Sequence, residues 1–70
     1  MWIYKVIFLW IICTSQIKVG EYTYTQRDTA IVEFQRLKKA MIKEHYLFFD
    51  NGEKCNKVKL DSVYYPEKAQ

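Results

Sequence analysis

The chain has 70 residues, of which 50% are apolar, 17% aromatic and 27% charged, and its formal net charge is +3. A chain of this length forms one small domain and buries only about 60% of its unfolded surface, and the composition excludes an intrinsically disordered protein. The charge of +3 is weak beside the basic stripe of a dedicated nucleic-acid-binding protein.

An apolar run opens the chain, from Trp2 to Cys13, and only Lys5 interrupts it. This run has three possible interpretations: an export signal, a membrane-spanning helix or a β-strand. A spanning helix needs about 20 apolar residues, and the run ends before that. An export signal has its basic residue ahead of its apolar stretch, whereas apolar residues precede Lys5. The β-branched and aromatic side chains favour a strand. A short secreted protein with cleaved signal peptide 1–15 stays as an alternative.

Read as a strand, the run is apolar on both faces, because successive side chains point to opposite sides. One face carries Trp2, Tyr4, Val6, Phe8, Trp10 and Ile12, and the other carries Ile3, Lys5, Ile7, Leu9, Ile11 and Cys13. A strand of this kind is normally central in a sheet that is covered on both sides.

A second strand is predicted over residues 17–25, which are rich in threonine and tyrosine. We expect a tight turn at residues 14–16 to connect the two strands. Gly20 indicates a β-bulge in the second strand.

An amphipathic helix follows. Thr25 and Asp28 have the spacing of a capping box, with Asp28 or Thr29 as alternative N-caps. The apolar stripe at helical spacing consists of Ala30, Phe34, Leu37 and Met41, with Ile31 beside it. The candidate nucleic-acid contacts, which occupy much of the remaining helix surface, are Arg36, Lys38, Lys39 and Lys43.

A β-hairpin is predicted around Asn51-Gly52, because Asn-Gly is typical of a two-residue hairpin turn. This turn pairs Leu47 with Asn56 and His45 with Val58. On the core side we expect Leu47, Phe49, Val58 and Leu60, and on the other side Tyr46, Phe48, Cys55, Lys57 and Lys59. Pro66 ends the last strand, and residues 67–70 are expected to form a frayed tail.

These elements predict a single small α+β domain over residues 1–66, in ββαββ order. One amphipathic helix packs on a largely antiparallel four-stranded sheet. Because one helix covers one face of such a sheet, we expect the second apolar face of the first strand to need a partner.

Catalytic, metal-binding and cofactor motifs do not emerge from the spacing of the polar residues, so we expect neither an enzyme nor a cofactor. His45 is predicted to be a partly buried structural residue, because the expected hairpin pairs it with Val58. Cys13 and Cys55 are expected as buried thiols without a disulfide between them.

The excess of aromatic residues favours a small, non-enzymatic protein-interaction module. We expect a homodimer that binds and blocks another macromolecule in the cytoplasm of a host cell, like the accessory or inhibitor proteins of phages and mobile elements. The predicted interface residues are Ile3, Ile7, Leu9, Ile11, Tyr46, Phe48, Tyr64 and Tyr65. A small basic nucleic-acid-binding protein is the main alternative, and no membrane span is expected.

Overall fold

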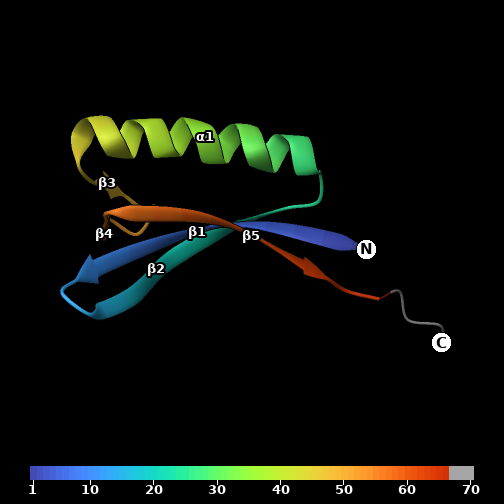
Figure 1. Ribbon diagram of the computed structural model, residues 1–70, viewed down its shortest axis with the longest axis horizontal. Coiled ribbons are helices and arrows are strands. Elements are labelled where there is room, and N and C mark those ends of the chain that lie inside the picture. Colours follow the sequence, from blue (N-terminus) through green and yellow to red (C-terminus); the bar gives the residue numbers. More distant parts are fainter. Residues whose placement is uncertain (67–70) are drawn as a thin grey trace.

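The computed structural model describes residues 1–66, which form five strands and one helix. In chain order the elements are β1 (Trp2–Ile12), β2 (Ser15–Tyr24), α1 (Arg27–Glu44), β3 (Leu47–Phe48), β4 (Lys54–Cys55) and β5 (Lys57–Tyr64). An antiparallel sheet has the order β2-β1-β5, and β3 and β4 form a second, two-stranded sheet. α1 lies along one face of the larger sheet (Figure 1). The α+β prediction of one helix on an antiparallel sheet is confirmed, but the single four-stranded sheet is wrong.

β1 is the central strand, as its two apolar faces predicted. Its residue Val6 pairs with Tyr22 of β2 on one side and with Leu60 of β5 on the other. The turn after β1 consists of Cys13 and Thr14, because Ile12 pairs with Ser15. The turn predicted at residues 14–16 is therefore wrong: the turn begins one residue earlier and contains two residues, not three. Cys13 takes the positive φ of 56° that the tight connection requires.

A bulge interrupts β2 next to the predicted position. Phe8 pairs with Gly20 whereas Leu9 pairs with Lys18, so Val19 is the extra residue. Gly20 itself serves close packing, because a Cβ there would overlap the ring of Phe49. This contact brings the β3–β4 hairpin onto β2.

α1 begins one residue later than a capping box at Thr25 requires. Gln26 is the N-cap, its side chain makes no capping hydrogen bond, and its carbonyl accepts the first helical bond from the N–H of Ala30. The predicted capping box is therefore wrong. Asp28 instead lies in the first helical turn, where its charge is favourable for the helix dipole.

The C-terminal end of α1 is at His45, which has a left-handed φ of 71°. Its backbone N–H donates a hydrogen bond to the carbonyl of Met41, and its side chain is exposed. The prediction of a partly buried His45 beside Val58 is wrong, because the chain reverses at this residue and the hairpin strand starts only at Leu47.

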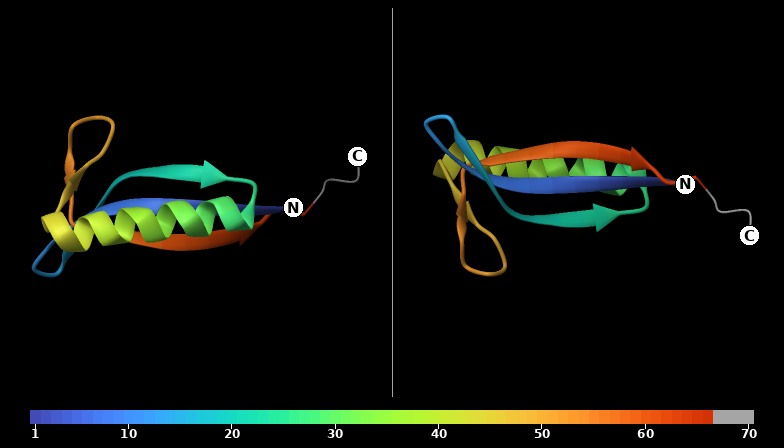
Figure 2. Two further views of the ribbon diagram at one scale, coloured as in Figure 1. Left: turned by 90° about the horizontal axis from the view of Figure 1, so that it is seen from above. Right: turned by 90° about the horizontal axis from the view of Figure 1, so that it is seen from below.

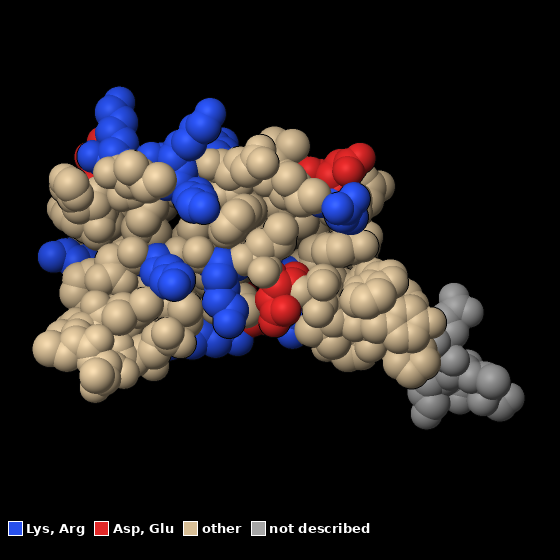
Figure 3. Space-filling view, viewed as in Figure 1, with Lys and Arg blue, Asp and Glu red and all other residues tan. Residues whose placement is uncertain are grey.

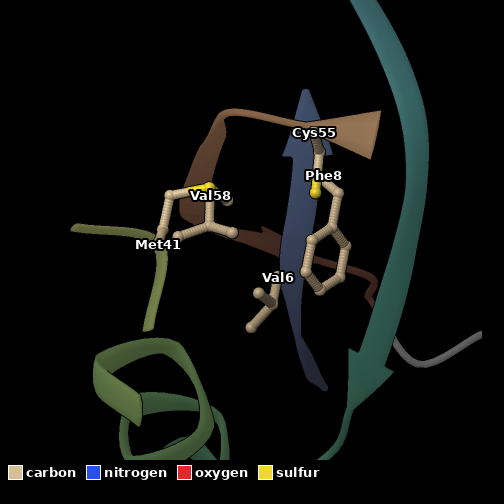
Figure 4. Close-up of a cluster of buried hydrophobic side chains, with 5 residues drawn as sticks. All are labelled: Val6, Phe8, Met41, Cys55 and Val58. Carbon is tan, nitrogen blue, oxygen red and sulfur yellow. The ribbon is translucent and has the colours of Figure 1, made fainter. Parts of the chain in front are cut away.

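The core lies between α1, the larger sheet and the hairpin. Its buried cluster consists of Val6, Phe8, Met41, Cys55 and Val58 (Figure 4). The helical stripe predicted from the sequence faces this cluster, since Ala30 and Met41 are buried and Phe34 and Leu37 pack against it. Burial of each large apolar side chain contributes about 1.5–3 kcal/mol.

The β3–β4 hairpin has a different register from the predicted one. Leu47 pairs with Cys55, and the N–H of Phe49 bonds to the carbonyl of Glu53, so the loop contains three residues. Gly52 supplies the positive φ, 83°, at the end of this loop. The shift of one residue moves Cys55 from the outer side to the core, and the two-residue turn is wrong.

The hairpin covers a part of the sheet that α1 leaves open. Figure 2 shows it projecting past α1 on the side of β2. The ring of Phe49 packs on Phe8 and Tyr22, at centroid distances of 4.9 and 5.3 Å. The Tyr22 hydroxyl donates a 2.7 Å hydrogen bond to Asp50 at the hairpin tip. This small sheet therefore completes the cover over β2.

Asn56 connects β4 to β5 and continues the ladder beside β1. Its side chain accepts a hydrogen bond from the N–H of Ile11 and donates one to the carbonyl of Ile11, and its own N–H bonds to the carbonyl of Leu9. β5 then runs to Tyr64, as expected from Pro66. The tail predicted at residues 67–70 lies outside the described residues.

Candidate functional site

The face of the sheet opposite α1 carries four of the predicted interface residues. They are Ile3, Ile7, Leu9 and Ile11. Leu9 is only 6% exposed and the three isoleucines are partly buried, although no helix within residues 1–66 covers this face. The uncovered apolar patch expected here is therefore smaller than its composition suggests.

Long charged side chains explain this burial. Residues opposed on adjacent strands share a face, so Leu9 lies between Lys18 and Lys57, and Ile7 lies between Glu21 and Lys59. The aliphatic stems of lysines cover neighbouring apolar surface while their charges stay in water. This face is thus an apolar row between two charged rows, and its role as an interface stays a prediction.

Glu21 joins two lysines on this face. Its carboxylate forms ion pairs with Lys18 and, at 3.8 Å, with Lys5. The hydrogen bond and the charge of Lys18, with a smaller effect of Lys5, outweigh partial desolvation and lower the pKa of Glu21. Lys5, which interrupts the apolar run in the sequence, therefore has an anionic partner on the neighbouring strand.

Exposed aromatic residues gather at the two ends of the sheet. At one end, the rings of Trp2 and Tyr64 lie 5.2 Å apart, and Met1 and Tyr65 exchange backbone hydrogen bonds beside them. All four side chains are exposed. Tyr64 and Tyr65 were predicted as interface residues, and they lie at this end.

The other end carries a more varied surface, which we call the end surface and define as Trp10, Ile17, Val19, Tyr46, Phe48, Glu53 and Lys54. Five of these residues line a groove of about 350 Å³: Trp10, Ile17, Val19, Glu53 and Lys54. Beside it, the rings of Tyr46 and Phe48 form an edge-to-face pair at 5.5 Å. Phe48 is 62% exposed and Ile17 is 55% exposed. The predicted interface residues Tyr46 and Phe48 thus lie far along the sheet from Tyr64.

Lys54 organises the end surface. Its ammonium nitrogen lies 4.8 Å from the ring centroid of Tyr46 and 6.0 Å from that of Trp10, within the range of a cation–π interaction. One charge is thereby held between aromatic rings that come from β1 and from the segment before β3. The end surface thus offers an apolar groove that is lined by one cation, Lys54, and one carboxylate, Glu53.

The four candidate nucleic-acid contacts on α1 do not act as one patch. Arg36 forms an ion pair with Glu33 at 2.6 Å, and Lys38 lies 5.8 Å above the ring of Phe34. At 100° per residue, Lys39 and Lys43 lie on the outer side of the helix and Lys38 lies on its flank. In this view, acidic side chains lie beside basic ones at both ends of α1, and the charged side chains between them are basic (Figure 3).

The described residues give no support to a metal site or a membrane-spanning helix. Within residues 1–66, no group of three or more His, Cys, Asp and Glu side chains is placed to hold a metal ion. The one helix of this part of the chain is neither long nor apolar enough to cross a membrane. Both cysteines are free thiols, but Cys13 is exposed in its turn, so its predicted burial is wrong.

Sequence reasoning did not bring Trp10, Ile17 and Lys54 together on one surface. Trp10 was placed on the same face as Val6 and Phe8, but β1 extends beyond the part of the sheet where those residues are buried. Ile17 reaches the same surface because it pairs directly with Trp10. The three-residue hairpin loop places Lys54 next to both, and the Asn-Gly dipeptide alone does not reveal that loop length.

Comparison with protein-family models, with curated proteins and with solved structures finds no match to this chain.

Proposed function

We propose that this chain is a small, non-enzymatic protein-interaction module that binds its partner through the end surface. The supporting observation is the exposure of Phe48 and Ile17 beside the groove of Trp10 and Lys54. Aromatic residues dominate the binding energy of protein interfaces, and exposed apolar residues that gather around a groove are typical of binding sites.

The chemistry of the surface indicates the partner. The groove is mainly apolar, and Lys54 lies at its side between two aromatic rings. Glu53 lines the same groove. A protein segment with an apolar side chain between a carboxylate and a cation fits this lining, because the carboxylate pairs with Lys54 and the cation with Glu53 while the apolar side chain enters the groove. Such binding blocks the segment of the partner that it covers, in the manner of an inhibitor or accessory protein of a phage or mobile element acting in the host cytoplasm.

Affinity capture from host lysate with Phe48→Ser tests this proposal. We expect wild-type protein to enrich one protein at about 0.3 M salt, where binding driven by phosphate contacts is weak, and Phe48→Ser to lose it. Val32→Ser is the matched control, because Val32 is also 62% exposed but lies on α1. Equal capture by the wild type and by Phe48→Ser contradicts the proposal.

Nucleic-acid binding is the alternative that the same experiment separates. Arg36 and Lys38 are already engaged with Glu33 and Phe34, which leaves Lys39 and Lys43 of the predicted contacts on the outer helix face. If the chain enriches nucleic acid alone, and added salt removes it, the alternative replaces the interaction module.

A further inference from the structure

β5 offers a regular edge of the sheet to a further strand. It has eight residues, and its ladder with β1 runs from Tyr64 to Lys57 without a register shift. β2, the outer strand on the other side, is interrupted by its bulge and is overlaid by Phe49. A bulge discourages strand addition, so β5 is the better edge for it.

The backbone groups of β5 that face outward follow from its pairing with β1. Met1 and Tyr65 exchange both of their backbone hydrogen bonds, and pairs of this kind alternate along an antiparallel ladder. The odd-numbered residues of β5 therefore bond to β1. The N–H and C=O groups of Val58, Leu60 and Ser62 point away from it.

Two copies of β5 can pair about a two-fold axis perpendicular to the sheet, which keeps both helices on one side. Outward-facing residues must then oppose one another. With Leu60 on the axis, Val58 faces Ser62 of the second copy and exchanges backbone hydrogen bonds with it. Lys59 then faces Asp61 of the second copy, and the two-fold axis repeats this pair. Both are non-hydrogen-bonded pairs, in which opposed side chains lie closest to one another.

Charge selects this register among its neighbours. One of the two nearest registers that still oppose outward-facing residues places Asp61 against Asp61. The other places Lys59 against Lys59, and this repulsion offsets its two Lys57–Asp61 pairs, because directly opposed like charges are destabilising. Only the register centred on Leu60 opposes unlike charges without also opposing like charges. We propose that the chain forms a homodimer by antiparallel pairing of β5 with β5 of a second copy, centred on Leu60, with reciprocal Lys59–Asp61 ion pairs. The two sheets then form one continuous six-stranded sheet.

Side chains beside the edge also suit a second copy. A groove of about 240 Å³ runs between α1 and β5, and the residues that line it include Ile31, Leu60 and Arg27. Ile31 and Leu60 are partly buried there. Ile42 lies on the same flank of the helix, three turns further on, and is exposed. The helix of the second copy approaches this flank, so the dimer covers apolar surface in addition to the strand edge.

Asp61 also protects the edge of the isolated chain. Its Oδ1 accepts a 2.9 Å hydrogen bond from the N–H of Ser62, one of the outward-facing groups. To pair with β5, an added strand must displace the Asp61 carboxylate from the N–H of Ser62. A strand without a cation opposite Asp61 offers that carboxylate no ion pair in return. Lys59 of the second copy supplies the cation, and the carbonyl of its Val58 takes the Ser62 N–H. The same residue therefore discourages other strands and favours this one.

Reversing the charges one at a time and then together tests the register. We expect Lys59→Asp and Asp61→Lys each to raise the dimer dissociation constant roughly tenfold to hundredfold, because each puts like charges opposite one another twice. The double variant Lys59→Asp/Asp61→Lys restores the dimer. An equimolar mixture of the two single variants forms a heterodimer, because their charges are complementary. Sedimentation equilibrium and native mass spectrometry measure these species.

Lys39→Asp is the matched control for Lys59→Asp, because it makes the same change of net charge on the outer side of α1. We expect it to leave the dimer intact. Circular dichroism checks that each variant is folded. Hydrogen exchange on the wild type gives a second measurement that needs no variant: the amide protons of Val58 and Leu60 exchange slowly in the dimer. A monomeric wild type, dimeric single variants, a monomeric double variant, or fast exchange of these amides in the dimer overturns the proposal.

The end surface takes no part in this contact, because Phe48 and Trp10 lie outside β5. Phe48→Ser therefore remains dimeric, and Lys59→Asp keeps its partner-binding groove. The dimer proposal and the partner proposal consequently fail or succeed independently.

Discussion

Gly20 shows at the scale of one residue how the hairpin is held against the sheet. The ring of Phe49 occupies the space of the absent side chain. We expect Gly20→Ala to lower the free energy of unfolding by about 1–3 kcal/mol, because overpacking displaces the ring from Phe8 and Tyr22. Urea denaturation measures the loss. In a Phe49→Leu background the loss becomes smaller, and equal losses in both backgrounds would contradict this packing.

The two thiols differ in reactivity for a structural reason. Cys55 is fully buried, and desolvation raises the pKa of its thiol, whereas Cys13 is exposed in the turn after β1. Because the thiolate is the reactive form, we expect iodoacetamide to modify Cys13 in the native protein and Cys55 only after denaturation. Peptide mass spectrometry locates the label, and native Cys13→Ser should remain unmodified. Labelling of Cys55 in the native protein would refute this expectation.

Tyr22 links stability to alkaline pH. Its hydrogen bond to Asp50 is the largest of the effects that raise its pKa, and desolvation adds to it. A group with a raised pKa in the folded state contributes stability that is fully present below its unfolded pKa, about 10, and is lost as pH rises through the folded value. We expect Tyr22→Phe to lose less stability than wild type over this pH range in urea denaturation. Identical pH profiles would be the contrary result.

At the scale of elements, the Asn56 side chain takes the place of a backbone partner between β4 and β5. The Asn56 amide makes both hydrogen bonds to Ile11, at 2.8 and 2.9 Å. Asn56→Ala leaves two backbone groups of β1 without these partners, so we expect it to cost about 1–3 kcal/mol. Thermal denaturation of Asn51→Ala provides the control, because Asn51 makes its hydrogen bond in the exposed loop. A smaller loss for Asn56→Ala than for the control would rule out this role.

At the scale of the whole molecule, both outer strands of the larger sheet depend on β1. It supplies the ladders of both β2 and β5 and the core residues Val6 and Phe8. We therefore expect a chain that lacks residues 1–15 to be unfolded, as circular dichroism would show. A folded truncated chain would instead support the alternative of a secreted protein whose signal peptide is removed. Full-length protein prepared in the same way is the control.

Local patterns were sufficient for the helix and for the central strand. The apolar stripe of Phe34, Leu37 and Met41 has the period of an α-helix, and it packs on the core. The two apolar faces of the first run predicted the position of β1 between two strands. These features depend on periodicity, which a chain carries within a few residues.

Loop length and register were not predictable in the same way. The Asn-Gly dipeptide indicated a hairpin at the correct place, but Phe49 and Glu53 close a three-residue loop. The shift of one residue exchanged the faces of the strand, which brought Cys55 into the core. His45 likewise resembled a strand residue, yet it ends α1.

The sequence by itself determined the helix with its buried apolar stripe and the central position of the first strand, because these follow from local periodicity and hydrophobicity. Tertiary structure decided which apolar residues stay exposed. The aliphatic stems of lysines cover Leu9 on the face of the sheet opposite α1, and the length of the hairpin loop places Lys54 beside Trp10. The pairing of β5 with β1 sets which of its backbone groups face outward. Each of these outcomes depends on contacts between residues distant in the chain, which local patterns do not specify.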